Sequence, residues 1–251
     1  MTVEKRLQEI RKEIEVCHAC PLAKGRDRSV PGEGPARVDI LFIGEAPGFH
    51  ENRQGKPFVG QAGQFLDELL KAAGVDRSQV FITNVVKCRP PNNRDPLPEE
   101  LQACSVYLDE QIALLQPKVI VTLGRISMGK FVNAGRISSI HGKTHNVNGQ
   151  KVVTMYHPAA ALHQPALRQT LIEDFARLKK FISADAQAET PSPTPKPVSK
   201  TDHEPGPKPS SAPEPQPKPQ GTPLAATPAE PVKAEPAQPE TPKPPEQLSL
   251  F

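Results

Sequence analysis

The stretch Val38-Asp39-Ile40-Leu41-Phe42-Ile43-Gly44-Glu45-Ala46-Pro47-Gly48 decides the fold. It opens with an apolar run of strand length, and the glycines and proline that follow cannot extend that strand. Such a turn leaves backbone N–H groups free at the carboxyl end of a strand, where open α/β sheets bind ligands. We therefore predict a buried strand followed by a pocket that contains the carboxylate of Glu45.

Three later apolar runs also end in residues suited to a turn or a site. They are Val80–Thr83 before Asn84, Val119–Leu123 before Gly124, and Val152–Tyr156 before His157. Helical patterns separate the runs, which favours parallel strands whose carboxyl ends meet at one edge. An Asn in a turn or a His before Pro often has only a structural role. Their joint placement with Glu45 instead predicts a shared site.

The helical patterns complete an α/β architecture. Apolar residues spaced by three or four predict a helix over the first fifteen residues, and further helices over 61–73, 98–115 and about 165–182. We predict one domain over residues 1–182, with three layers in the order α/β/α and a central, mainly parallel, four-stranded sheet.

The charge is divided unevenly along the chain. From residue 184 onward there are six Lys and nine Asp or Glu, a net charge of −3, which leaves +6 for the rest of a chain whose total is +3. A basic body favours a polyanionic partner such as nucleic acid. The first fifteen residues are charged throughout, and no apolar run reaches the roughly 18 residues of a membrane span. We expect a cytoplasmic protein that contacts no membrane.

Four cysteines predict a metal centre, because structural disulfides are rare in the cytosol. Cys17 and Cys20 have the spacing with which one turn grips one metal centre, and the following Pro21 is typical of iron–sulphur segments. Cys88 and Cys104 supply a second, widely spaced pair. Structural zinc is the alternative, although zinc motifs usually repeat the short spacing in both halves.

Taken together, these segments resemble the family 4 uracil-DNA glycosylases, the iron–sulphur branch of their superfamily. The residues that carry the resemblance are the four cysteines, Gly44–Gly48, Gly55–Gly60, Thr83–Cys88 and His157–Leu162. The resemblance implies a uracil-DNA glycosylase fold, a 4Fe-4S cluster on the four cysteines and excision of uracil from DNA.

The resemblance also implies roles for individual residues. Phe58 would lie against the uracil ring, Asn84 would pair with O4 and N3–H, and His157 with the backbone near Gly44 and Ala46 would stabilise negative charge at O2. Glu45 and Glu51 would favour the cationic sugar or orient water, and the sequence does not divide these tasks between them. Expected DNA contacts are Arg125, Lys143 and, as an apolar wedge, Leu162.

The last part of the chain differs in composition, since 19 of the 31 prolines lie beyond residue 190. Residues 183–246 lack the apolar side chains that would offset ordering entropy, so we predict a disordered linker. The final peptide, with Gln247, Leu248, Leu250 and Phe251, is similar to the motif by which bacterial repair proteins bind the sliding clamp.

Two functions from different classes are consistent with these features. The first is a monomeric, monofunctional enzyme that hydrolyses the glycosidic bond of uracil in DNA. The second is a module of the same fold that binds DNA or the clamp without catalysis. The complete set Glu45, Phe58, Asn84 and His157 favours the enzyme.

Overall fold

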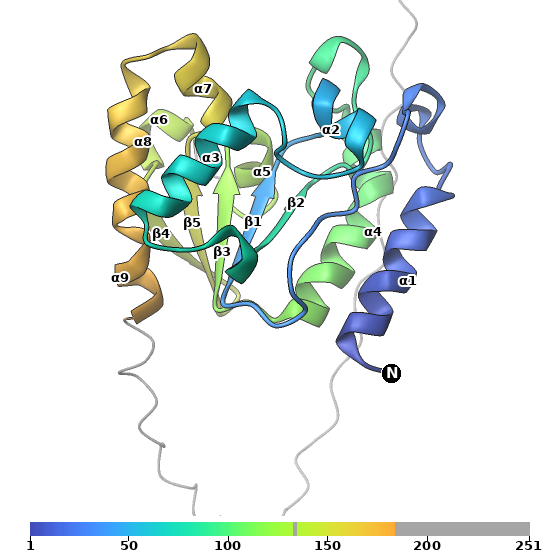
Figure 1. Ribbon diagram of the computed structural model, residues 1–251, viewed down its shortest axis with the longest axis horizontal. Coiled ribbons are helices and arrows are strands. Elements are labelled where there is room, and N and C mark those ends of the chain that lie inside the picture. Colours follow the sequence, from blue (N-terminus) through green and yellow to red (C-terminus); the bar gives the residue numbers. More distant parts are fainter. Residues whose placement is uncertain (133–134, 184–251) are drawn as a thin grey trace, which may run out of the picture. The chain divides into compact units, whose positions relative to one another are not determined.

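The computed structural model describes residues 1–132 and 135–183 (Figure 1). Within these residues, five strands form one sheet in the order β2-β1-β3-β5-β4. The strands are β1 (Ile40–Gly44), β2 (Phe81–Asn84), β3 (Val119–Leu123), β4 (Lys143–Val147) and β5 (Gln150–Met155). β1 pairs in parallel with β2 and β3, and β3 pairs in parallel with β5. The mainly parallel α/β sheet is thus confirmed.

The helices lie on both faces of this sheet (Figure 1). They are α1 (Val3–Glu15), α2 (Phe49–Gln54), α3 (Gln61–Ala72), α4 (Pro98–Leu115), α5 (Arg125–Gly129), α6 (Ile137–Ile140), α7 (Pro158–His163), α8 (Leu167–Ala176) and α9 (Leu178–Ser183). Over the described residues, no helix is long and apolar enough to cross a bilayer.

Alternating side chains of β1 hold the three layers together. Ile40 and Phe42 belong to an apolar cluster with residues of α3, α7 and α8, and Phe42 stacks on Phe175 with ring centroids 6.0 Å apart. Leu41 and Ile43 belong to a second cluster with residues of α4, against which Leu7 of α1 packs. Because both faces are covered, all five residues of β1 are buried.

The sequence predicted four strands, whereas the described residues form five, because β4 was not predicted. β4 pairs antiparallel with β5 at the edge of the sheet, and its residues are exposed or half-buried. An edge strand of polar residues lacks the apolar run that marks a buried strand. The single helix expected over 165–182 is divided into α8 and α9 at Arg177.

The register of the sheet sets up the site. Gly44 at the end of β1 lies directly beside Asn84 at the end of β2. β5 ends at Met155, two residues before His157, which caps the N-terminus of α7. The predicted polar residues therefore meet at one edge of the sheet. The predicted linker and clamp peptide lie outside the described residues from 184 onward.

Candidate active site

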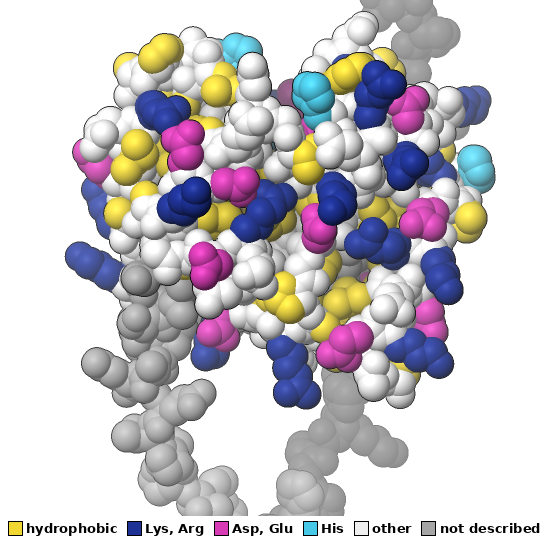
Figure 2. Space-filling view, viewed as in Figure 1, with side chains coloured by type: hydrophobic (Ala, Val, Ile, Leu, Met, Phe, Trp, Pro, Cys, Tyr) yellow, Lys and Arg dark blue, Asp and Glu magenta, His cyan; other side chains and the backbone are white. Residues whose placement is uncertain are grey.

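A cavity of about 560 Å³ lies at the carboxyl ends of β1, β2 and β5. Seen from the side, the molecule is hollowed at the top, between the part that carries α7 and the part that carries α2 (Figure 2). The predicted residues that line the cavity are Glu45, Ala46, Glu51, Phe58, Asn84 and His157. Most of the predicted site therefore surrounds one cavity.

The imidazole of His157 is neutral and has a defined tautomer. Burial lowers its pKa to about 4, and the nearby Glu51 carboxylate only partly opposes this effect. Nδ1 accepts a hydrogen bond from the backbone N–H of Ala159 at 3.1 Å, so Nδ1 carries no proton. The remaining proton of the neutral ring is on Nε2, and His157 therefore offers one N–H donor.

The amide oxygen of Asn84 is a buried hydrogen-bond acceptor without a partner. The residue is 1% exposed, and within the described ranges no group pairs with its Oδ1. A buried polar atom left unpaired costs about 1–3 kcal/mol, so a ligand that pairs with it gains specific affinity. Gly44 makes room for this amide, because a Cβ built there would lie 2.4 Å from Asn84 Oδ1 and 2.7 Å from Phe58 Cζ.

Phe58 is held in a strained conformation beside the cavity. Its φ of 51° is rare for a residue with a side chain, at a cost of about 1–3 kcal/mol. Gly63 permits it, because a Cβ there would lie 1.9 Å from Phe58 O. Glu51 Oε1 also accepts the backbone N–H groups of Val59 and Gly60, each at 2.8 Å. The Phe58 ring is thereby set against His157, with centroids 5.5 Å apart.

Glu45 belongs to a cluster of charged side chains that could not be predicted from the amino-acid sequence. Burial raises the pKa of Glu45, the neighbouring Asp95 carboxylate raises it further, and Arg125 lowers it. Arg125 in turn forms an ion pair with Asp95. Glu45 is consequently a stronger base than an ordinary glutamate, and its protonation depends on both neighbours.

Sequence reasoning missed several residues that line the cavity, among them Asn93, Asp95 and His163. The first two lie in a loop rich in Arg, Asn and Pro, which has no periodic pattern. Arg94 is anchored by a two-fold hydrogen bond to the buried carboxylate of Glu100, at 2.7 and 2.8 Å.

The three predicted DNA contacts do not line the cavity. Arg125 adjoins it through Asp95, and Leu162 is 42% exposed on α7 between residues of its wall. Lys143 is at the start of the edge strand β4, where its Nζ donates to Ser139 O at 2.9 Å. Their role in DNA binding stays a prediction.

The four cysteines come together from three segments. None forms a disulfide; Cys88 and Cys104 are buried in one apolar cluster, and Cys20 packs against it. Cys17 interacts electrostatically with Cys88. Arg26 donates to Cys88 Sγ at 3.3 Å, as the Ala19 N–H does to Cys17 Sγ at 3.5 Å. Converging thiols with N–H donors suit thiolate ligands of a metal cluster.

Burial also affects these thiols. It raises the pKa of Cys104 to about 11, an effect that the nearby Lys87 partly opposes. In the part of the chain that the structure describes, no three His, Cys, Asp or Glu side chains are spaced to share one metal ion.

A buried lysine connects the cysteines to the cavity. Lys87 Nζ donates to Asn84 O at 2.9 Å, to Thr83 Oγ1 at 2.6 Å and to Gln111 Oε1 at 2.8 Å. Burial lowers the pKa of Lys87 to about 8. Lys87 precedes Cys88, so its three bonds fix the backbone between the amide of Asn84 and one thiol.

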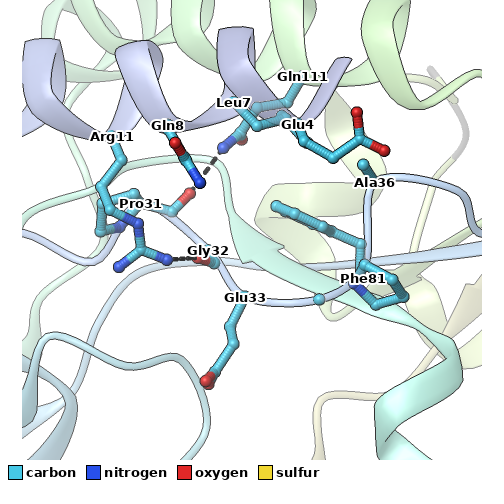
Figure 3. A pocket seen from close by; sticks show the side chains of 12 residues that line it. Glu4, Leu7, Gln8, Arg11, Pro31, Gly32, Glu33, Ala36, Phe81 and Gln111 are labelled. Carbon is cyan, nitrogen blue, oxygen red and sulfur yellow. Dashed lines mark hydrogen bonds between the residues drawn. The ribbon is translucent and has the colours of Figure 1, made fainter. Parts of the chain in front are cut away.

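A second hollow, of about 270 Å³, lies beneath α1 (Figure 3). None of the predicted site residues lines it. Arg11 donates to Gly32 O at 3.0 Å and Gln111 to Pro31 O at 2.8 Å, so these polar side chains tie α1 and α4 to the loop before β1. We interpret this hollow as structural.

Comparison with known proteins agrees with this geometry. Residues 31–181 match the family model described as "Uracil DNA glycosylase superfamily". The chain is 47% identical to the type-4 uracil-DNA glycosylase of Sulfurisphaera tokodaii, over 69% of this chain and 84% of that protein. It is 40% identical to the type-4 uracil-DNA glycosylase of Thermotoga maritima, over 73% of this chain and 98% of that protein.

A type-5 uracil-DNA glycosylase of Thermus thermophilus is more distant, at 36% identity over 52% of this chain and 68% of that protein. The matched residues include the ends of all three strands that surround the cavity. The chain therefore belongs to the uracil-DNA glycosylase superfamily and, within it, to the type-4 uracil-DNA glycosylases.

Proposed function

We propose that this protein is a monofunctional uracil-DNA glycosylase, which hydrolyses the N-glycosidic bond of uracil in DNA and leaves an abasic site. The observation that carries the proposal is the unpaired, buried amide oxygen of Asn84, which lies in one cavity with the Phe58 ring and the N–H donor of His157. The catalytic domain would comprise residues 1–182.

These three groups are suited to a flipped uracil. The base must leave the duplex stack before its glycosidic bond can be reached. Its ring would lie against Phe58, and the Asn84 amide can accept from N3–H and donate to O4 at once. Cytosine presents the reversed donor and acceptor at these positions, so the same amide would disfavour it.

Cleavage of the bond leaves negative charge on uracil and positive charge on the sugar. The Nε2–H of neutral His157 would donate to O2 and stabilise the departing base. The Glu51 carboxylate, which two backbone N–H groups hold in place, suits the cationic sugar. Glu45, whose pKa is raised, suits the activation of water.

A direct assay tests this function. The purified protein is incubated with a labelled uracil-containing oligonucleotide, single- or double-stranded, and alkali then cuts the strand at abasic sites. We expect cleavage at uracil, free uracil as the released product and strong losses for Asn84→Ala and His157→Ala. A folded protein that releases no uracil from either substrate would favour a non-catalytic DNA-binding module instead.

We further propose that Cys17, Cys20, Cys88 and Cys104 hold a 4Fe-4S cluster. The support is four free thiols, of which those of Cys88 and Cys104 share one apolar cluster and that of Cys20 packs against it. Such a cluster would join the segment after α1, the loop after β2 and helix α4. Pure protein should be brown and contain iron and sulphide, whereas a colourless protein with one bound zinc would refute the cluster.

The C-terminal peptide is proposed to bind the bacterial sliding clamp, with 183–246 as a flexible linker. Gln247, Leu248, Leu250 and Phe251 would supply the contacts, which would concentrate the enzyme near DNA. Purified clamp should retain the full-length protein in a pull-down, and deletion of Phe251 should abolish this retention. Equal retention of both forms would reject this partner. A monomeric, cytoplasmic protein would be consistent with both proposed partners, DNA and the sliding clamp.

A further inference from the structure

The short helix α2 carries side chains to the cavity and to the surface. Glu51 lines the cavity, whereas Phe49 is 48% exposed. Single exposed apolar residues are normal on protein surfaces, so exposure alone indicates no function. The surroundings of Phe49 are more informative.

Two guanidinium groups lie near the Phe49 ring. The Cζ atoms of Arg53 and Arg89 are 5.6 and 5.4 Å from its centroid, and the ring of His50 meets it edge-on at 5.4 Å. Arg89 is oriented by a hydrogen bond to Asn93 Oδ1 at 2.8 Å. Within the described ranges, neither guanidinium forms an ion pair with a carboxylate. The cluster thus combines an accessible aromatic ring with two cations free for an anion.

This cluster is on the rim of the cavity. Phe49 is bounded in sequence by the lining residues Gly48 and Glu51, and Arg89 directly precedes the lining residue Pro90. α2 and α7 flank the ends of the central strands (Figure 1). A uracil in the cavity stays bonded to its strand, so the neighbouring nucleotides must cross this rim.

The chemistry of the cluster matches a nucleotide. Aromatic side chains stack on bases whatever their sequence, and arginines bind the phosphates that join them. When uracil leaves the stack, each neighbouring base loses a stacking partner and exposes a face. An aromatic ring on the rim can cover that face.

We propose that Phe49, Arg53 and Arg89 form a DNA subsite for a nucleotide next to the uracil, with the base stacked on Phe49 and its phosphate near the guanidinium groups. The proposal rests on the proposed function, because the uracil in the cavity positions the neighbouring nucleotide. It adds a contact outside the cavity that does not depend on which base is bound.

The test compares Phe49→Ala and Phe49→Trp in the full-length protein, with Val106→Ala as the matched control. Val106 is 59% exposed on α4 and lines no described cavity. Single-stranded oligonucleotides carry 2-aminopurine beside the uracil, on its 5′ side or on its 3′ side. Binding is followed by anisotropy, stacking by quenching of 2-aminopurine, and cleavage by single-turnover kinetics.

We expect Phe49→Ala to weaken DNA binding about 10-fold, within the range measured for one base–aromatic stack. It should also abolish the quenching of 2-aminopurine on one side of the uracil. Phe49→Trp should retain both the DNA binding and the quenching. Inhibition by free uracil, which needs the cavity alone, should be unchanged. Arg53→Gln should reduce the salt dependence of binding by about one phosphate contact.

The outcomes separate the two proposals. If the unmodified protein releases no uracil, the proposed function fails. If it is active but folded Phe49→Ala binds and quenches like the unmodified protein, the subsite is refuted and Phe49 is an ordinary surface residue. A Phe49→Ala that loses affinity for free uracil would also refute it, because the effect would then arise inside the cavity.

Discussion

The substitution Gly44→Ala is the most direct test of the cavity geometry. A Cβ at this position would lie 2.4 Å from Asn84 Oδ1 and 2.7 Å from Phe58 Cζ, whereas ordinary contact begins at 3.4 Å. Both neighbours are buried, at 1% and 6% exposure, so they cannot swing into solvent. The amide must therefore move by about 1 Å, the difference between 3.4 and 2.4 Å.

The size of the effect follows from this displacement. Misplacing a reacting or binding group by about 1 Å can reduce a rate about 100-fold, or roughly 2.7 kcal/mol at 1.36 kcal/mol per tenfold. Overpacking a buried site costs about 1–3 kcal/mol of folding stability. We expect kcat/KM on uracil-containing DNA to fall about 100-fold, with a moderate decrease in Tm.

The assay is single-turnover cleavage of a labelled uracil oligonucleotide, at a temperature where circular dichroism shows both proteins folded. Gly129→Ala is the control, because a Cβ at Gly129 would meet nothing within 4 Å. The control should keep full activity. A folded Gly44→Ala protein within about threefold of the unmodified rate would refute the inferred contact between residue 44, the amide and the ring.

Three further predictions address binding, pH dependence and stability. Asn84→Ala should lower kcat/KM by about 10- to 100-fold, from the loss of one or two buried hydrogen bonds at about 1–3 kcal/mol each, as measured by single-turnover cleavage. If ionised Glu45 is required, activity should fall as pH decreases through its raised pKa; Asp95→Asn removes a neighbouring negative charge and should move this acidic limb of the pH–rate profile to lower pH. The pairing with Arg94 lowers the pKa of Glu100, so this pair should stabilise the fold at neutral pH and lose its contribution as pH falls through that pKa. The difference in urea stability between the unmodified protein and Glu100→Gln should therefore be present at pH 7 and shrink as the pH falls below the ordinary pKa of a glutamate.

Each of these predictions has an opposing result. Unchanged discrimination between uracil and cytosine in Asn84→Ala would remove the amide from base recognition. An acidic limb of the pH–rate profile that stays in place or moves to higher pH in Asp95→Asn would show that ionisation of Glu45 does not cause this limb. A stability difference for Glu100→Gln that grows as pH falls would contradict the ion pair with Arg94.

Much of the fold followed from local patterns. The apolar runs that became β1, β2, β3 and β5 are buried on both faces, so their composition alone distinguishes them from loops. β4 has no such pattern, because its side chains are partly exposed and its partner is on one side only. Its existence depends on hydrogen bonds to β5, which leave no periodic signal in the sequence.

The candidate site divides in the same way. Glu45, Asn84 and His157 each follow a strand, and parallel strands bring their carboxyl ends together, so the sequence by itself determined that these residues would meet. Only the tertiary structure placed Asp95 beside Glu45 and Arg89 beside Phe49. These contacts join segments far apart in the chain, and their geometry depends on how those segments pack.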